Sequence, residues 1–302
     1  MEKPKFLEKI RVNPIVKKDL KVLSRSMKIA WGVFAYEAVL SIIFFFATYM
    51  IFDAFSSYGF TSDYQDFMAL FPILAGVQFG IIALIMPIIT ASAVSGEKEK
   101  QTFDLLLTTV MTPKAIVRGK VTSAVIRMMV FIIGSVPLMA ISFTIGGISW
   151  GCLFITMIAF MIFAILTGSI GIFASTLTKK SITAIILTYV FYFVVGQASV
   201  VPALIMFLVN SNTGSSAISV LMIINPVAAI LEMFLLMLSG EDLFSNNPLG
   251  FFSGWGWVIV SGIVMLLMSW GLQRLAAWRI DPLHGYLVRN KKKKNSMKVV
   301  TS

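Results

Sequence analysis

The sequence is poor in the residues that carry most enzyme chemistry. Its 302 residues include one cysteine, Cys152, and one histidine, His284. A single cysteine excludes an intrachain disulfide and any cluster of cysteine ligands. No apolar stretch pairs two carboxylates or a histidine with a carboxylate, which argues against an intramembrane hydrolase or metalloprotease. The chain also lacks a GxxxxGK[ST] phosphate-binding loop, so we expect it to hold no cofactor and to hydrolyse no ATP itself.

Charged residues are also scarce. They make up 13 % of the chain, whereas 58 % is hydrophobic and the mean hydropathy is +0.89. A soluble domain is nearer a quarter charged, so the solvent of this chain must be largely lipid. The net charge of +11 is compatible with nucleic-acid binding. In a membrane protein it is better explained by basic residues retained at the cytoplasmic face, and we expect no nucleic-acid partner.

Long apolar stretches dominate what is present. Each is close to or longer than the roughly 20 residues that a helix needs to cross a bilayer. The sequence therefore predicts an all-α polytopic membrane protein with six transmembrane helices, at about residues 27–52, 67–94, 120–144, 150–177, 181–209 and 254–275.

The stretch 216–238 competes for the role of a seventh span. Asn225-Pro226 interrupts it near the middle, and Glu232 follows. We interpret it as two short re-entrant or interfacial helices on the external face, between spans five and six, a backbone that is tolerated only where protein or water satisfies it. An irregular external loop is the alternative.

Basic residues alternate with the spans. They occur before the first span, in 95–120, at Lys179 and Lys180, and after Arg274, whereas 53–66 and 210–253 contain none. The positive-inside rule then places both termini in the cytoplasm. The predicted organisation is a cytoplasmic N-terminal segment (1–26), a transmembrane domain (27–275) and a basic cytoplasmic tail (276–302).

The N-terminal segment has the pattern of an amphipathic helix. Asn13-Pro14 is a favourable helix start. One side then carries Val16, Leu20, Leu23 and Met27, and the other carries Lys17, Lys18, Lys21 and Arg25. Such a helix lies in the membrane interface with its cations toward anionic headgroups. The sequence leaves open whether it only anchors the chain or also contacts a cytoplasmic partner.

The stretch 95–120 is the long polar interruption between the second and third spans. Its spacing predicts a short amphipathic helix that Pro113 ends. The apolar face consists of Phe103, Leu106, Leu107 and Val110, and the polar face of Glu97, Lys100, Gln101 and Asp104. A patterned helix on the basic side of the membrane indicates a docking surface for a soluble protein.

The same stretch carries a family resemblance. The run from Glu97 through Leu107, then Thr108, Thr109, Pro113 and Gly119-Lys120, resembles the coupling-helix region of the ABC type-2 permease family. That family usually has Gly where this chain has Gln101, and Pro where it has Val110. The short outer helices around an Asn-Pro, between the fifth and sixth spans, also agree with the family.

The resemblance implies a permease subunit of an ATP-binding cassette exporter in the plasma membrane of a bacterium. It implies a dimer with an identical or sister permease, and separate ATPase subunits that carry ATP and Mg²⁺. The residues expected to couple to the ATPase are Glu97, Glu99, Thr102, Asp104, Leu105, Leu106, Thr108 and Pro113. A non-transport membrane assembly factor and a passive channel or ion-coupled carrier stay open as alternatives, although the latter usually have several polar residues at mid-membrane.

Two features within the spans carry further predictions. Glu37 lies some ten residues into the first span and Arg127 a similar distance into the third, so they form a candidate intramembrane ion pair. Alternatively, Arg127 reaches the inner interface and Glu37 is protonated or faces a wet cavity. The fourth span carries two series of small residues at steps of four, Ala164 and Gly168, then Thr167, Gly171 and Ser175. This spacing predicts a close helix approach, which is either a functional contact within the permease or ordinary packing within the chain.

Overall fold

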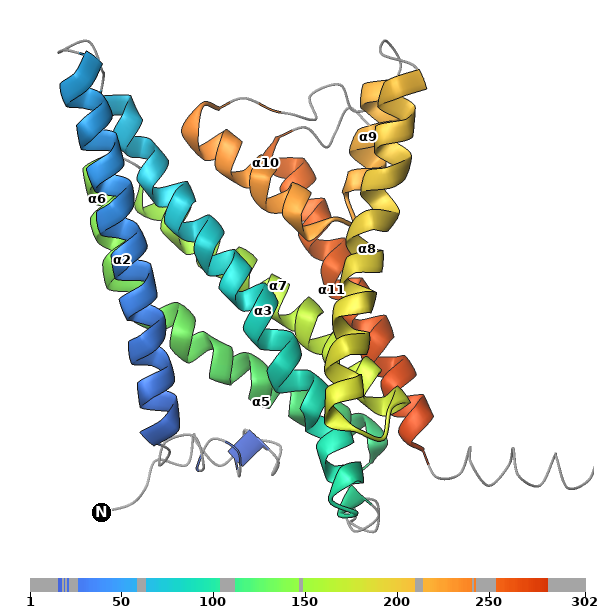
Figure 1. The fold of residues 1–302 in the computed structure, drawn as a ribbon. Coiled ribbons are helices and arrows are strands. Elements are labelled where there is room, and N and C mark those ends of the chain that lie inside the picture. The colour runs from blue at the N-terminus through green and yellow to red at the C-terminus, as the bar shows by residue number, and fades with distance from the viewer. Residues whose placement is uncertain are drawn as a thin grey trace, which may run out of the picture.

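The computed structural model describes residues 16, 17, 19, 21, 27–58, 64–103, 112–146, 149–209, 214–240, 242 and 254–281. This part of the chain is all-helical and contains no strand (Figure 1). In order, the main elements are α2 (Met27–Tyr58), the 3-10 helix η2 (Tyr64–Ala69), α3 (Leu70–Glu99), α5 (Pro113–Gly134), α6 (Val136–Gly146), α7 (Trp150–Leu177), α8 (Ser181–Val209), α9 (Gly214–Met222), α10 (Pro226–Leu238) and α11 (Trp255–Ile280).

Five of these helices, α2, α3, α7, α8 and α11, are long and apolar enough to cross a membrane. A sixth crossing arises if α5 and α6, which meet at an angle of 42°, form one bent span. The all-helical class is confirmed, and the six predicted spans lie within this range of five to six. Helices α7 and α8 begin and end where the sequence predicted.

The bend between α5 and α6 was not predicted. The chain reads Gly134-Ser135-Val136-Pro137 here, and Pro137 lies in the first turn of α6. A proline has no N–H to donate to the preceding turn, and Gly/Ser pairs are common at kinks. The third span therefore divides at Ser135 instead of running straight through.

Helix α7 is the centre of the bundle. Buried residues make up 56 % of its most apolar stretch, against 17 % for that of α2, and it packs against α3, α5, α8 and α11. Its approach to α3 requires small residues. A Cβ on Gly171 would overlap the side chain of Thr90, and one on Gly168 would lie 2.9 Å from Cε of Met86. The predicted close approach is confirmed, and the contact lies within this chain.

The stretch around Asn225 folds as two short helices. Helix α10 has 13 residues, too few to cross a bilayer. The Asn225 side chain accepts from the backbone N–H of Val227 (2.9 Å) and so caps α10. Two bonds join α9 and the turn after it to α11, since Trp257 Nε1 donates to the Ser219 carbonyl and the Ser261 hydroxyl donates to the Ile223 carbonyl.

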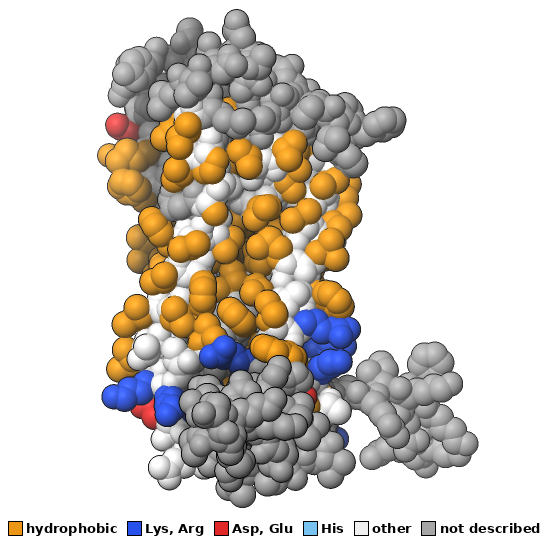
Figure 2. All heavy atoms as spheres, turned by 90° about the vertical axis from the view of Figure 1, so that its right-hand side faces the viewer, with side chains coloured by type: hydrophobic (Ala, Val, Ile, Leu, Met, Phe, Trp, Pro, Cys, Tyr) orange, Lys and Arg blue, Asp and Glu red, His pale blue; other side chains and the backbone are white. Residues whose placement is uncertain are grey.

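The surface divides into an apolar belt and a charged end. In Figure 2 hydrophobic side chains cover the middle of the visible face, and Lys and Arg side chains gather at its lower border. We call this the basic end; it includes Lys98, Lys100, Lys114, Lys120, Lys179, Lys180, Arg274 and Arg279. Helices α9 and α10 lie toward the opposite end in Figure 1.

The N-terminal segment is described at four positions, all helical: 16, 17, 19 and 21. Val16 is buried, whereas Lys17 and Lys21 are exposed. The Ser123 hydroxyl of α5 donates to Oδ2 of Asp19 (2.6 Å). Lys18 and Arg25 lie outside the described residues, so the amphipathic interfacial helix stays a prediction.

Candidate functional site at the basic end

Helix α3 ends in a turn at Gln101. The N–H of Gln101 donates to the Lys98 carbonyl (3.2 Å) and that of Thr102 to the Glu97 carbonyl (2.9 Å). These two bonds form a Schellman motif, whose turning residue adopts a left-handed conformation. Gln101 has φ +59°, the one positive φ at a non-glycine residue in the described part of the chain. This is the position where the family usually has glycine, because glycine alone takes that conformation without cost.

The turn overturns one detail of the predicted amphipathic helix. We expected Glu97, Lys100 and Gln101 on the polar face of a separate helix. Instead, residues 95–99 continue α3, and the chain reverses at Gln101. Pro113 begins α5, with Thr112 as its cap, so the helix that contains the third predicted span starts seven residues before position 120. Asp104, Leu105, Leu106 and Thr108 lie outside the described residues, so their coupling role stays a prediction.

Three consecutive charged residues, Glu97, Lys98 and Glu99, end α3, and we call them the charged triplet. Successive residues of a helix project about 100° apart, so three neighbours in sequence can reach three different partners. In this structure each of them contacts a different helix.

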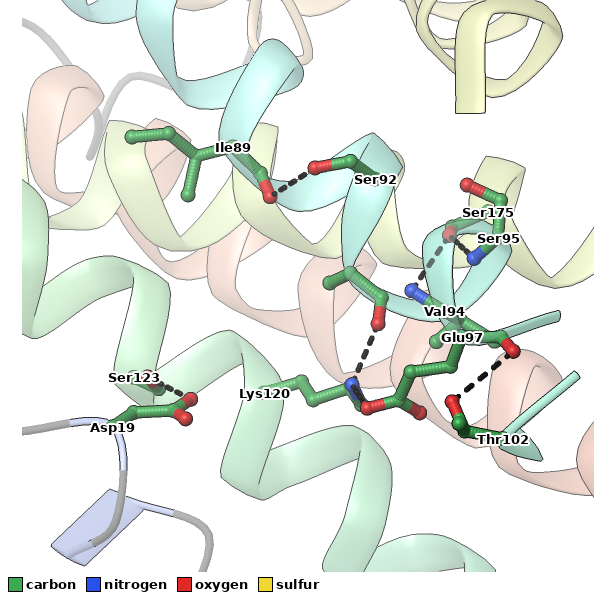
Figure 3. Close-up of polar contacts among 11 residues, drawn as sticks. Asp19, Ile89, Ser92, Val94, Ser95, Glu97, Thr102, Lys120, Ser123 and Ser175 are labelled. Carbon is green, nitrogen blue, oxygen red and sulfur yellow. Dashed lines mark hydrogen bonds and ion pairs between the residues drawn. The ribbon is translucent and has the colours of Figure 1, made fainter. Parts of the chain in front are cut away.

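Glu97 contacts α5. Its Oε1 lies 2.7 Å from Nζ of Lys120, which also donates to the Ala93 carbonyl (2.6 Å) (Figure 3). The Lys120 side chain is 10 % exposed and that of Glu97 32 %. A charge-assisted bond that is partly shielded from water is stronger than an ordinary surface ion pair, so this contact fixes α5 against α3.

Lys98 contacts the end of α7. Its Nζ donates to the carbonyls of Thr176 (2.7 Å) and Thr178 (3.2 Å). The last carbonyls of a helix have no partner within it and carry partial negative charge. The Lys98 ammonium supplies both the missing hydrogen-bond donor and a compensating positive charge. It also lies 5.6 Å from the ring centre of Phe103.

Glu99 contacts the beginning of α8. Its Oε2 accepts from the backbone N–H of Ser181 (3.1 Å) and from the Ser181 hydroxyl (2.7 Å). A carboxylate at a helix N-terminus satisfies a free N–H and is attracted by the positive end of the helix dipole. Glu99 therefore joins α3 to α8.

A buried serine strengthens the same junction. The Ser175 hydroxyl of α7 accepts from the backbone N–H groups of Val94 (3.0 Å) and Ser95 (2.8 Å) (Figure 3). Contacts of this kind, between positions about 80 residues apart, have no local sequence signal. Lys120 belongs to the family motif in the sequence, whereas no sequence pattern identified Lys98, Ser175 and Ser181 as partners.

Glu37 and Arg127 are not joined in the structure, contrary to the candidate ion pair. Glu37 Oε1 and Arg127 Nε are both buried without a hydrogen-bond partner. Glu37 lies opposite Gly134 instead, since a Cβ built there would be 2.8 Å from its Oε1. Gly134 is about 10 Å of helix beyond Arg127. Helix α5 slants across the bundle in Figure 1, so equal residue counts along α2 and α5 do not give equal depth.

The described residues contain no group of three His, Cys, Asp or Glu side chains that is arranged to hold a metal ion. What the basic end does contain is a set of interlocked helix ends. These contacts fix the ends of α3, α5, α7 and α8 to one another.

The fold and this site define a multi-pass α-helical membrane protein. The chain belongs to the ABC-2 transporter family, because the family model described as "ABC-2 family transporter protein" matches residues 14–272. The chain is thus the permease component of an ABC transporter, a membrane transport component that is not itself catalytic. Permeases of this family work with ATP-binding cassette ATPases and usually dimerise. No curated protein matches the chain.

Proposed function

We propose that the chain is the membrane subunit of an exporter in a bacterial plasma membrane. A separate ATPase hydrolyses ATP and binds at the basic end, which lies in the cytoplasm. The distribution of basic residues supports this orientation, because Lys and Arg are retained on the cytoplasmic side. Two permease copies, identical or related, close one translocation path.

The charged triplet is the observation that carries the mechanism. It joins the end of α3 to α5, α7 and α8 through Glu97, Lys98 and Glu99. A force applied to the connection between α3 and α5, residues 100–112, is therefore passed to four helices together. A partner shifts such an equilibrium only if it binds the two conformations with different affinity, so the ATPase must contact this connection differently with and without ATP.

The docking step is tested by co-expressing the chain with its ATPase and isolating the complex. In the double variant Leu105→Asp/Leu106→Asp we expect normal membrane insertion, loss of the co-purified ATPase, and no ATP hydrolysis by the isolated chain. The matched control is Ser239→Asp, which adds a charge at an exposed position of the opposite end and should retain the ATPase. Retention of the ATPase by the double variant, or ATP hydrolysis by the permease alone, would contradict the proposal.

A further inference from the structure

Three cationic side chains meet in a cleft that has no part in the mechanism proposed above. The cleft is formed by Lys114 and Arg118 of α5 and by Trp270, Gln273 and Arg274 of α11. The two helices pack against each other, although these positions are about 150 residues apart in sequence. Lys114 and Arg118 are one helical turn apart, as are Trp270 and Arg274, so each helix directs its pair to one side.

Within the described part of the chain, no carboxylate pairs with the cations of this cleft. Among the described residues the ion pair is Glu97–Lys120, and neither Lys114, Arg118 nor Arg274 takes part in another. Like charges held close together repel, at a cost that an anion in the cleft would remove. The cleft also lies at the beginning of α5, where Thr112 caps the helix and the positive end of the helix dipole favours an anion.

The cleft is held in a fixed geometry. Gln273 Nε2 donates to the hydroxyl of Ser169 (2.9 Å), which joins this part of α11 to α7. The Arg274 guanidinium lies 4.6 Å from the ring centre of Trp270, a cation–π contact that orients it.

The surroundings of the cleft point to a lipid. On α11, Ile259, Ile263, Leu267 and Trp270 recur at steps of four, four and three and are all exposed, which makes them a membrane-facing stripe. Arg274 follows Trp270 one turn later on α11, and Figure 2 shows Lys and Arg side chains gathered below the apolar belt. Tryptophan is enriched at this level of the membrane because its ring is apolar and its N–H is polar. A ligand here would place its charge in the cleft and its apolar part along the stripe.

We propose that this cleft binds the phosphate headgroup of an anionic phospholipid, with the acyl chains lying along the exposed stripe of α11. The phosphate accepts from Arg118 and Arg274, and Lys114 adds charge. The proposal does not depend on the direction of transport or on the ATPase.

Native mass spectrometry of the delipidated full chain, titrated with phosphatidylglycerol or phosphatidylcholine, tests the site. The wild-type protein should prefer phosphatidylglycerol. Because each basic residue near an anionic surface contributes about fivefold, the variant Arg118→Gln/Arg274→Gln should bind this lipid roughly 30-fold more weakly. The matched control Lys179→Gln/Lys180→Gln removes the same charge from exposed positions of the α7–α8 turn and should change the affinity by less than about twofold.

A second variant keeps the test decisive if the Gln double variant does not fold. Arg118→Lys/Arg274→Lys retains the charge and should keep most of the lipid preference. Equal phosphatidylglycerol binding by wild type and both Gln variants overturns the proposal. The cations would then belong to a surface that contacts another protein. An equal loss in both Gln variants also overturns it, because the effect would then be diffuse. Displacement of the lipid by an equal concentration of inorganic phosphate would show a site for a soluble anion, with the same consequence.

Discussion

Gln101 occupies a backbone conformation that glycine adopts freely and other residues do not. Its φ of +59° follows from the turn that ends α3, and its side chain is exposed. The residue type is thus in conflict with the backbone, without a packing contact to compensate. The sequence alone showed the departure from the family pattern, but only the hydrogen bonds of Lys98 and Thr102 explain it.

We expect Gln101→Gly to stabilise the protein by about 1 kcal/mol, because the left-handed conformation costs a residue with a Cβ about that much. The apparent melting temperature in detergent should rise by about 2 °C. Gln101→Ala keeps the Cβ and should give no increase. If both substitutions shift the melting temperature equally, the backbone conformation is not the cause.

Gly134 allows α2 to approach α5. We expect Gly134→Ala to destabilise the protein by at most about 1 kcal/mol, because the added methyl group meets Glu37 Oε1, the movable end of a flexible side chain. Combining it with Glu37→Ala should recover part of the loss, which a double-mutant cycle on the melting temperature measures. Gly80→Ala is the control, since nothing lies within 4 Å of a Cβ at that position, and it should stabilise the protein by up to about 1 kcal/mol because alanine favours a helix interior.

Helix boundaries were predictable where composition changes abruptly. Helices α7 and α8 could be bounded because Ser149 and the turn at Lys179-Lys180 flank long apolar stretches. The end of α3 could not, because Ser95 to Glu99 are polar, and hydropathy alone cannot distinguish a loop from a helix that continues beyond the membrane. The bend at Ser135 had a signal in Gly134-Ser135 and Pro137, which the apolar run around it obscured.

The contact between α3 and α5 gives a prediction about paired charges. Glu97→Lys and Lys120→Glu alone should each lower the stability, and the double reversal should restore part of it. Recovery should be incomplete, since Lys120 also donates to the Ala93 carbonyl. Double reversal of Glu37 and Arg127 should restore nothing, because no ion pair joins these two described residues. The measurement is again the melting temperature. Recovery of stability in the Glu37/Arg127 double reversal and none in the Glu97/Lys120 double reversal would contradict this assignment of partners.

On the scale of the whole molecule, the basic end and the pair of short helices α9 and α10 lie at opposite ends. Cysteine labelling can establish which end faces the cytoplasm, because Cys152 is the only natural cysteine. In a Cys152→Ser background, we expect Lys179→Cys to react with an impermeant maleimide only in inverted vesicles, and Ser239→Cys only in intact cells. The reverse pattern would invert the orientation inferred from the basic residues.

The triplet at the end of α3 also restricts how the molecule can move. Turning α3 about its own axis would break the contacts to Lys120, Thr176 and Ser181 at the same time, whereas tilting the four helix ends as a block breaks none. We expect the helices to bend where their backbone hydrogen bonds are already interrupted, such as the 42° angle at Ser135 and Pro202 within α8. The linked helix ends therefore move as one rigid unit, and the helices bend at positions farther from the basic end.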